Sequence, residues 1–405
     1  MPKKITHFLF IVTPLLVFFS AMAMTPLLLA LALLALLPFS RNHLRGSFQA
    51  LAADKTLLLL LACVLVWPLV STLWSIAPQV TLLTCLRVTA MCCIGALAWK
   101  ASVDAAPLAP RAVQWLALTL IIVCLLLLLE QLPAGGMMGL VAEHTGGDIS
   151  SFLYKTVNRG LCALVLLIWP IFFGLERIGQ RRLGVGLVVL LGVALMLMES
   201  LSAQLGYVAG LMTFLLVRAM PRFFPLFLLV AAPVLFFVMP FLTMWLLQQP
   251  ITINHLAELR DISSGRILIW PALLEAASGH DWLGSGMKVS NLFVIPKATL
   301  AAIPLDATPL HPHHSMLQIW LELGTIGLAL VTVALALLLR RLRANFAPSH
   351  PAQAAIYATV IAYLGAGFSS FSIWQNWWQA MPWILLLLWQ YLLPRGWNSS
   401  VPLNK

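Results

Sequence analysis

Three histidines stand within four positions at the start of the segment HPHHSMLQIWLELGTIG, as His311, His313 and His314. Gln318 and Glu322 follow them inside an otherwise apolar run. Histidine is suited to taking up a proton near neutral pH. On a helix, His314, Gln318 and Glu322 lie on one face, because they are spaced four residues apart. The segment therefore predicts a proton-transferring site at the entrance of an apolar helix.

Arginines supply the second part of this chemistry. Arg87 lies inside an apolar run, roughly 12 Å from its nearer end, Arg159 lies near the start of another run, and Arg266 begins the stretch RILIWPALLEA. The guanidinium fork matches phosphate oxygens in pairs. We expect displacement at a carbon that bears a phosphate or diphosphate leaving group. The histidine would take the proton of an attacking hydroxyl, and the arginines would stabilise the departing diphosphate.

Each of these polar residues also has a structural interpretation. Arg87 could extend its side chain to the membrane surface, although its depth makes this difficult, so a site role is favoured. Arg159 fits an interface anchor as well as a site residue. Glu322 lies deep enough to need a partner, which could be one of the arginines or a structural hydrogen-bond donor.

A metal site is the alternative to arginine-based chemistry. Magnesium and manganese prefer carboxylate ligands, and the chain contains no Asp-x-Asp or Glu-x-Asp motif. His311, His313 and His314 could hold zinc, but their alternation around Pro312 does not present three imidazoles to one tetrahedral centre. We therefore expect no metal and no other cofactor.

The elements that position these residues are apolar helices. The chain is 61% hydrophobic and 9% charged, with a mean hydropathy of +0.96, which is unlike a soluble domain. Apolar runs recur at about 17–25 residues, the length that crosses a bilayer. We expect an all-α polytopic membrane protein with twelve spans, at residues 6–21, 25–39, 56–72, 80–99, 111–131, 157–174, 183–198, 203–217, 223–246, 315–339, 353–371 and 378–393.

The charges predict the orientation of these spans. The net charge is +11, which by itself suggests nucleic acid, but the basic residues follow the positive-inside rule and we expect no nucleic-acid partner. With both termini cytoplasmic, seventeen of the 24 basic residues fall on the inner side: Lys3, Lys4, Arg41, Arg45, Lys55, Lys100, Arg111, Arg177, Arg181, Arg182, Arg218, Arg222, Arg340, Arg341, Arg343, Arg395 and Lys405. The others lie on or near the outer side: Arg87, Lys155, Arg159, Arg260, Arg266, Lys288 and Lys297.

The predicted spans divide the chain into three segments. Residues 1–247 hold nine spans, residues 248–314 form one long outer loop, and residues 315–405 hold three more spans. Within the loop, SSGRILIWPALLEAASGHDW predicts an amphipathic helix that Ser263 or Ser264 caps. The six cysteines lie in apolar runs without metal-type spacing, so we interpret them as packing residues. The N-terminal apolar run resembles a signal peptide without a cleavage site, and we expect a retained first helix.

The segment HPHHSMLQIWLELGTIG resembles the signature of bacterial O-antigen ligases and of the related O-antigen polymerases and protein O-oligosaccharyltransferases. Their pattern is a histidine, then Asn, Ser or Gln, nine further residues and Gly-x-x-Gly. Counting back from Gly324 and Gly327 places the family histidine on His313. His314 departs from the pattern, because it stands where the family has an amide or a hydroxyl. The stretch SGRILIWPALLEAASGHDWLGSG resembles the arginine helix before that histidine.

The resemblance implies a GT-C-like helical membrane glycosyltransferase in the bacterial inner membrane. Its site would face the periplasm, and its donor would be a polysaccharide on undecaprenyl diphosphate. The transfer would be metal-independent and inverting, with His313 as catalytic residue and His314 as second candidate. Arg266 matches the family's diphosphate-binding arginine, and Arg87 or Arg159 would supply a further charge where the chain has Leu205. The expected supporting residues and the candidates for sugar stacking are His311, Gln318, Glu322, Trp282, Trp320 and Trp374.

The acceptor distinguishes the members of this family. A ligase transfers the glycan to a sugar of lipid A–core, a polymerase to another repeat unit, and an oligosaccharyltransferase to Ser or Thr of a protein. Polymerases generally have two sizeable outer loops, so one dominant loop favours the ligase, with lipid A–core as acceptor and membrane lipids as surroundings. A transporter of lipid-linked oligosaccharides is the non-enzymatic alternative. It would need polar residues through both halves of the bilayer, and the inner half here is nearly without them.

Overall fold

The computed structural model describes residues 2–37, 41–130, 149–198, 200–249, 266–293, 311–348, 350–369 and 371–393. For residues 2, 41, 149–156 and 266–268 it describes the backbone alone. Helices joined by turns and loops make up these ranges, and none of them contains a β-strand. The expected all-α class is thus confirmed.

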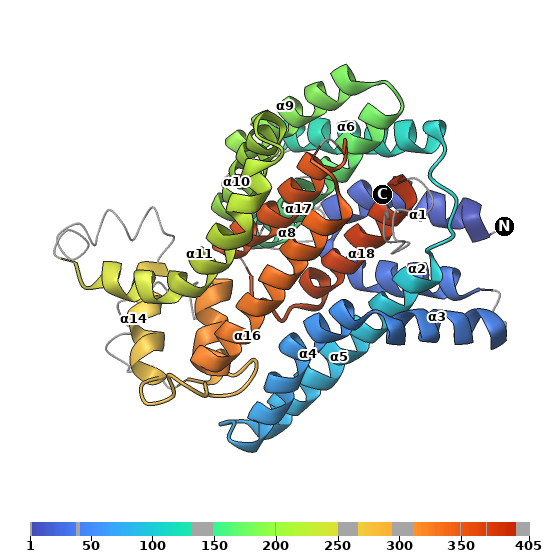
Figure 1. The fold of residues 1–405 in the computed structure, drawn as a ribbon. Coiled ribbons are helices and arrows are strands. Elements are labelled where there is room, and N and C mark those ends of the chain that lie inside the picture. The colour runs from blue at the N-terminus through green and yellow to red at the C-terminus, as the bar shows by residue number, and fades with distance from the viewer. Residues whose placement is uncertain are drawn as a thin grey trace.

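Figure 1 shows the helices packed side by side, with the N-terminal helices on one flank and α14 on the other. The α-helices are α1 (Pro2–Phe19), α2 (Met24–Leu36), α3 (Arg41–Ala53), α4 (Lys55–Val70), α5 (Pro78–Ala101), α6 (Pro110–Leu129), α8 (Ile149–Arg177), α9 (Arg181–Leu197), α10 (Leu201–Ala219), α11 (Phe223–Leu247), α14 (Arg266–Ala276), α16 (Ser315–Asn345), α17 (Gln353–Gly367) and α18 (Asn376–Leu392). Short 3-10 helices are η1 (Ala21–Ala23), η2 (Ser71–Leu73) and η3 (Ser290–Leu292).

Each of the twelve expected spans coincides with a helix. Among the described residues, seven helical segments are long and apolar enough to cross a membrane: Lys55–Leu73, Pro78–Ala101, Pro110–Leu129, Val157–Arg177, Leu201–Ala219, Phe223–Leu247 and Ser315–Asn345. The helices at the other five expected spans are shorter or less apolar, namely α1, α2, α9, α17 and α18. The structure therefore supports a multi-pass membrane protein, and the count of twelve spans stays a prediction.

Helix α8 lies at the centre of the bundle. It packs against α1, α6, α9, α10, α17 and α18. The stretch from Leu161 to Trp169 is buried on every side, with side chains 0–1% exposed. A helix that is apolar all round is stable only where other helices surround it. The apolar sequence LCALVLLIW thus becomes the core around which the remaining helices pack.

Two α-helices of the described part of the chain lie outside the expected spans. Helix α14 falls in the long loop where the sequence predicts an amphipathic helix, and its buried side includes Ile269, Ala272 and Leu273. The proposed capping serines, Ser263 and Ser264, lie outside the described residues. Helix α3 occupies a segment for which no helix was expected, and it packs on α5.

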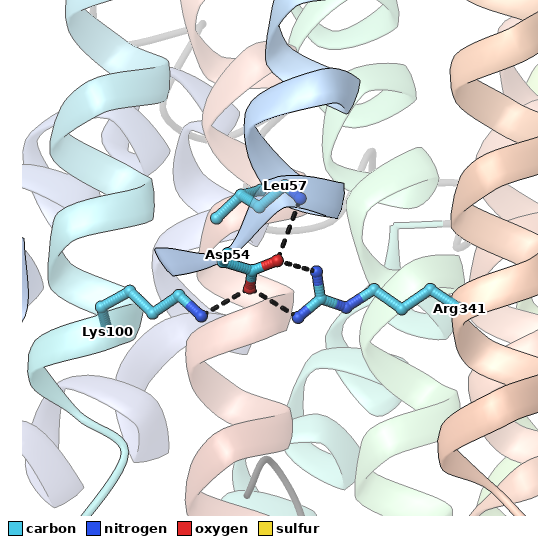
Figure 2. A network of polar contacts seen from close by, with 4 residues as sticks. All are labelled: Asp54, Leu57, Lys100 and Arg341. Carbon is cyan, nitrogen blue, oxygen red and sulfur yellow. Dashed lines mark hydrogen bonds and ion pairs between the residues drawn. The ribbon is translucent and has the colours of Figure 1, made fainter. Parts of the chain in front are cut away.

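A half-buried ionic cluster joins three helix ends, as Figure 2 shows. Asp54 caps α4 by accepting a bond from Leu57 N at 3.0 Å. Its carboxylate also receives Lys100 Nζ of α5 at 2.6 Å and both terminal nitrogens of Arg341 of α16 at 2.7 Å. Burial raises the pKa of Asp54, but the bonds from Arg341 and Lys100 outweigh burial and hold that pKa below its usual range. The cluster therefore fixes α4, α5 and α16 at one end of the bundle.

Helix α16 contains a break that the sequence reading did not anticipate. Gly324 has φ 67° and ψ −175°, so the helical path is interrupted there. A Cβ at this position would lie 2.2 Å from Trp282 O and 2.6 Å from Gly284 N. Only glycine permits both this conformation and this close approach. The break separates a short first segment, with Gln318 and Glu322, from the long apolar remainder of α16.

Candidate active site

His314 is the N-cap residue of α16. Its Nδ1 accepts a hydrogen bond from Leu317 N at 3.1 Å, as Asn or Ser side chains do at this position. The side chain is fully buried between Trp270 of α14 and Phe368 after α17, with ring centroids at 5.8 and 4.6 Å. Burial lowers the pKa of His314 to about 4. Its neutral ring therefore carries the proton on Nε2, and Nδ1 is occupied by the cap.

This capping role explains the departure from the family pattern. In this structure the residue after the family histidine is the N-cap, and it accepts a bond from the free N–H of Leu317 in the first helical turn. Asn and Ser do this with a side-chain oxygen, and His314 does it with Nδ1. Since the only lone pair of the neutral ring is engaged, His314 is poorly suited to take a proton from a substrate.

His313 stands in an unusual backbone conformation directly before this cap. Its φ is +54°, a value that a residue with a Cβ seldom adopts. Two bonds hold the turn: His313 N donates to His311 Nδ1 at 3.1 Å, and Trp270 Nε1 donates to Pro312 O at 2.8 Å. The rings of His311 and His313 lie 4.0 Å apart, and the side chain of His313 is half-buried. The turn thus fixes His313 at the rim of the site, where strained residues often serve function.

The break at Gly324 receives the backbone of a second segment. Four hydrogen bonds join the two: Ser285 N to Leu321 O at 3.2 Å, Gly286 N to Glu322 O at 2.8 Å, Thr325 N to Asp281 O at 2.8 Å and Ile326 N to Trp282 O at 3.3 Å. The indole of Trp67 in α4 donates to Leu323 O at 2.8 Å. Backbone groups freed by a helix break inside a membrane need such partners. The segment DWLGSG, residues 281–286, therefore supplies the backbone partners that α16 lacks at its break.

Glu322 is the point where three segments meet. Its carboxylate accepts bonds from Lys288 N at 2.6 Å, from Ser290 N at 3.3 Å and Ser290 Oγ at 2.6 Å, from Gln318 Nε2 at 2.9 Å and from Trp374 Nε1. The sequence left open an arginine or a structural donor as its partner. In the described part of the chain these partners are neutral donors. Glu322 therefore positions residues 286–290 and Trp374 around the first turns of α16.

The loop after α17 carries the remaining contacts of this centre. Gln318 donates to Ser372 Oγ at 2.9 Å, and its carbonyl oxygen accepts from Ile373 N at 3.1 Å. Together with Glu322 it fixes Ser372, Ile373 and Trp374 against α16. Gln318 and Glu322 lie on one helical face with the capping His314, as their spacing predicts.

Arg87 and Arg159 both lie against this loop. Arg87 of α5 donates to Trp374 O at 2.8 Å, and the guanidinium of Arg159 in α8 lies 5.7 Å from the ring centroid of Phe371. Both side chains are half-buried and point to the loop, so surface snorkelling does not describe Arg87. The Nε atoms of both arginines are buried without a hydrogen-bond partner among the described residues. Neither arginine forms an ion pair within those residues.

The other candidates stand as follows. Arg266 is the first residue of α14, one turn before Trp270, and its side chain lies outside the described part. Trp282 is 70% exposed, whereas Trp374 is buried with its indole bonded to Glu322. The indole of Trp320 is likewise bonded, to Thr325 Oγ1 at 3.1 Å. Of these three tryptophans, only Trp282 presents its ring for stacking on a sugar.

The described residues contain no group of three His, Cys, Asp or Glu side chains that could hold a metal ion. The cations Arg260 and Lys297 of the long loop lie outside the described residues, and Lys288 is exposed. Two features of the site escaped the sequence reading, namely the docking of residues 281–286 on Gly324 and the role of Trp374. The docking could have been inferred from the glycine pairs in the two segments, Gly-x-Gly in DWLGSG and Gly-x-x-Gly in ELGTIG.

The chain matches known proteins over the part that builds this centre. Residues 186–332, from α9 to the middle of α16, match the family model described as O-Antigen ligase. This segment includes the histidine turn, α14 and the break at Gly324. Residues 186–332 are thus similar to the O-antigen ligase family. The resemblance noted from the sequence is thereby confirmed.

Curated relatives of this chain occur in Rickettsia species and carry the name "Putative polysaccharide ligase". The protein of Rickettsia felis is 31% identical over 249 residues, which is 59% of this chain and 59% of the relative. That of Rickettsia conorii is 29% identical over 250 residues, covering 59% of this chain and 58% of the relative. The protein of Rickettsia prowazekii is 28% identical over 283 residues, which is 67% of this chain and 66% of the relative. The alignments span about three-fifths to two-thirds of each relative.

Proposed function

We propose that this chain is a membrane glycosyltransferase of the O-antigen ligase type. It transfers O-antigen polysaccharide from undecaprenyl diphosphate to a sugar hydroxyl of lipid A–core, on the periplasmic side of the bacterial inner membrane. The observation that carries the proposal is the O-antigen ligase match over residues 186–332, which contains His313 and its strained turn. The segments 1–247, 248–314 and 315–405 then serve as nine spans, a periplasmic loop and three spans.

His313 acts as general base in this proposal. The acceptor hydroxyl attacks the anomeric carbon from the face opposite the diphosphate. The new carbon–oxygen bond forms as the bond to the diphosphate breaks, and the hydroxyl proton passes to His313. Attack from the opposite face inverts the anomeric centre. His311, whose ring lies against that of His313 and whose Nδ1 accepts from His313 N, holds the base in place.

Arg87, Arg159 and Arg266 hold the diphosphate and neutralise the charge that develops on it. Support comes from the buried Nε atoms of Arg87 and Arg159, which have no acceptor among the described residues. Buried polar groups in proteins are nearly always paired, so such donors indicate a ligand with acceptor oxygens. Gln318 and Glu322 fix the loop that both arginines contact. Metal ions are not part of this mechanism, because the guanidinium groups carry out the charge neutralisation.

The test is a transfer assay with purified protein and an undecaprenyl-diphosphate-linked polysaccharide. Three acceptors are offered in parallel: lipid A–core, a lipid-linked single repeat unit, and a protein with accessible Ser and Thr. We expect transfer to lipid A–core, and unchanged transfer in excess EDTA. Transfer to the repeat unit alone would indicate a polymerase, and transfer to protein alone an oligosaccharyltransferase. Activity that EDTA abolishes and magnesium or manganese restores would contradict the metal-free mechanism.

A further inference from the structure

A cavity lined by arginines and apolar side chains lies at the end of the bundle opposite the histidines. It has a volume of about 510 Å³ and is lined by the start of α11, the end of α16 and the residues that lead into α17. Three arginines face it, Arg222, Arg340 and Arg343, together with apolar residues such as Leu229 and Phe346. We call this set of three arginines and its cavity the basic cavity. Its size falls within the range of about 300–1,000 Å³ that small-ligand sites have.

The arginines of the basic cavity have no carboxylate partner among the described residues, unlike Arg341, Arg218 and Arg181. Arg341 is bonded to Asp54, and Arg218 and Arg181 lie against Glu176. Arg222, Arg340 and Arg343 are exposed and form no ion pair within the described residues, and no carboxylate lines their cavity. The positive-inside rule explains why cations occur at this end. That rule does not explain why three arginines line one cavity. Three cations around a cavity concentrate positive potential there and attract an anion.

An apolar surface adjoins the basic cavity. Directly after Arg222, helix α11 exposes a row of large apolar side chains on a neighbouring face, and a shallow groove of about 440 Å³ runs along them. This row consists of Phe223, Leu226, Phe227, Val230 and Val234, which are 44–63% exposed. Helix α11 is one of the helices that are long and apolar enough to cross a membrane. An amphiphile could thus place an anionic group among the arginines and its chains along α11.

We propose that the basic cavity binds the headgroup of an anionic glycerophospholipid, with the acyl chains lying along the exposed face of α11. The phosphate accepts charge-assisted hydrogen bonds from the arginines, whose planar forks match phosphate oxygens. A soluble phosphate would use the arginines alone, whereas the apolar row beside them fits a lipid. This site is separate from the proposed transferase site, since α16 carries the histidines at its start and Arg340 near its end, roughly 40 Å away.

The test compares two triple variants in a neutral detergent. R222Q/R340Q/R343Q removes the three cations of the basic cavity. The control, R45Q/R111Q/R182Q, removes three exposed cations that the sequence assigns to the same side and that do not line it. Binding of phosphatidylglycerol and of phosphatidylcholine is measured by native mass spectrometry. Both variants should unfold at the wild-type temperature, because none of the six side chains has an ion-pair partner within the described residues.

We expect wild type and control to prefer phosphatidylglycerol over phosphatidylcholine, and the cavity variant to bind phosphatidylglycerol at least about tenfold more weakly, with phosphatidylcholine unchanged. Soluble glycerol phosphate should bind wild type more weakly than the lipid does. Equal weakening in both variants would show diffuse surface charge and overturn the proposal. So would glycerol phosphate that binds as tightly as phosphatidylglycerol, because the α11 face would then contribute nothing.

Discussion

At the scale of single residues, the hydrogen bond at Nδ1 of His314 distinguishes this histidine from His313. This nitrogen accepts the bond from Leu317 N, so the neutral ring is a helix cap with its proton on Nε2. His313 is not the cap residue, and it stands directly before the cap in a turn with positive φ. This difference favours His313 over His314 as the general base in the proposed mechanism.

Substitution of the two histidines should separate these roles. His313→Ala should lower transfer by ~10²–10⁴, the usual contribution of a general base, while binding of the lipid-linked donor stays near wild type. His314→Asn should keep most activity, because Asn caps a helix through its side-chain oxygen. Transfer and donor binding are measured separately. Full transfer by His313→Ala combined with loss in His314→Asn would reverse the assignment.

Burial of His314 also predicts how stability depends on pH. The folded protein holds the pKa of His314 at about 4, below its ordinary value of 6.5. The unfolded chain therefore binds a proton first, and the contribution of His314 to stability, complete above pH 6.5, is lost as pH falls towards 4. Thermal unfolding in detergent between pH 7 and 4 should show a smaller loss for His314→Asn than for wild type. Parallel curves for the two proteins would show that His314 does not titrate in this way.

Arg87 should act on the donor. Its guanidinium is held beside Trp374 with Nε unpaired, so a diphosphate would gain charge-assisted bonds in the ground state as well as in the transition state. Arg87→Ala should weaken both donor binding and transfer, and Arg87→Lys should recover only part, because the paired fork is lost. The exposed Arg182→Ala serves as control. Normal donor binding with failed transfer in Arg87→Ala would place the arginine at the transition state alone.

At the scale of elements, the interrupted helix α16 organises the site. The break at Gly324 lets residues 281–286 dock, and these residues lead to Lys288 and Ser290, which bind Glu322. The loop at Trp374 is held by the same carboxylate. Helix α5, with Arg87, and helix α14, with Trp270, thus reach one centre through α16.

Gly324→Ala should disturb this arrangement. The conformation at φ 67° and ψ −175° is essentially restricted to glycine. The Cβ of alanine would also meet Trp282 O at 2.2 Å, so the docked segment must move. We expect a lower unfolding temperature and much reduced transfer. Gly186→Ala in α9 is the matched control, because a Cβ there meets nothing within 4 Å. Wild-type stability in Gly324→Ala would show that the break is not required.

The sequence predicted the helices better than their irregularities. Apolar length alone placed a helix at each expected span, and the four-residue spacing put Gln318 and Glu322 on one face. The break at Gly324 depends on contacts with residues some forty positions earlier, which periodicity does not report. Likewise, the neutral donors around Glu322 come from distant loops. A capping role for His314 could have been inferred from its place directly before the apolar run.

At the scale of the molecule, polar contacts gather at two ends. Asp54 pairs with Lys100 and Arg341 at one end. Glu176 pairs with Arg218, and the positive-inside pattern assigns this second pair to the same side of the membrane. The histidine turn, the docked segment 281–286 and the Trp374 loop form the other end. These ion pairs join helix ends that the basic residues place on one side of the membrane. This agrees with spans that alternate in direction across the membrane.

This alternation yields a topology that labelling can check. We expect both termini in the cytoplasm and the histidine end in the periplasm, because the Lys and Arg clusters should remain inside. Ser278 and Asn345 are exposed at opposite ends, so Ser278→Cys and Asn345→Cys report one side each. Cys93 is exposed and is first changed to Ser, whereas the other five cysteines are buried. In intact spheroplasts an impermeant maleimide should label Ser278→Cys, and it should label Asn345→Cys only after the membrane is permeabilised. The reverse pattern would invert the orientation and place the proposed base on the cytoplasmic side, where a periplasmic acceptor does not reach it.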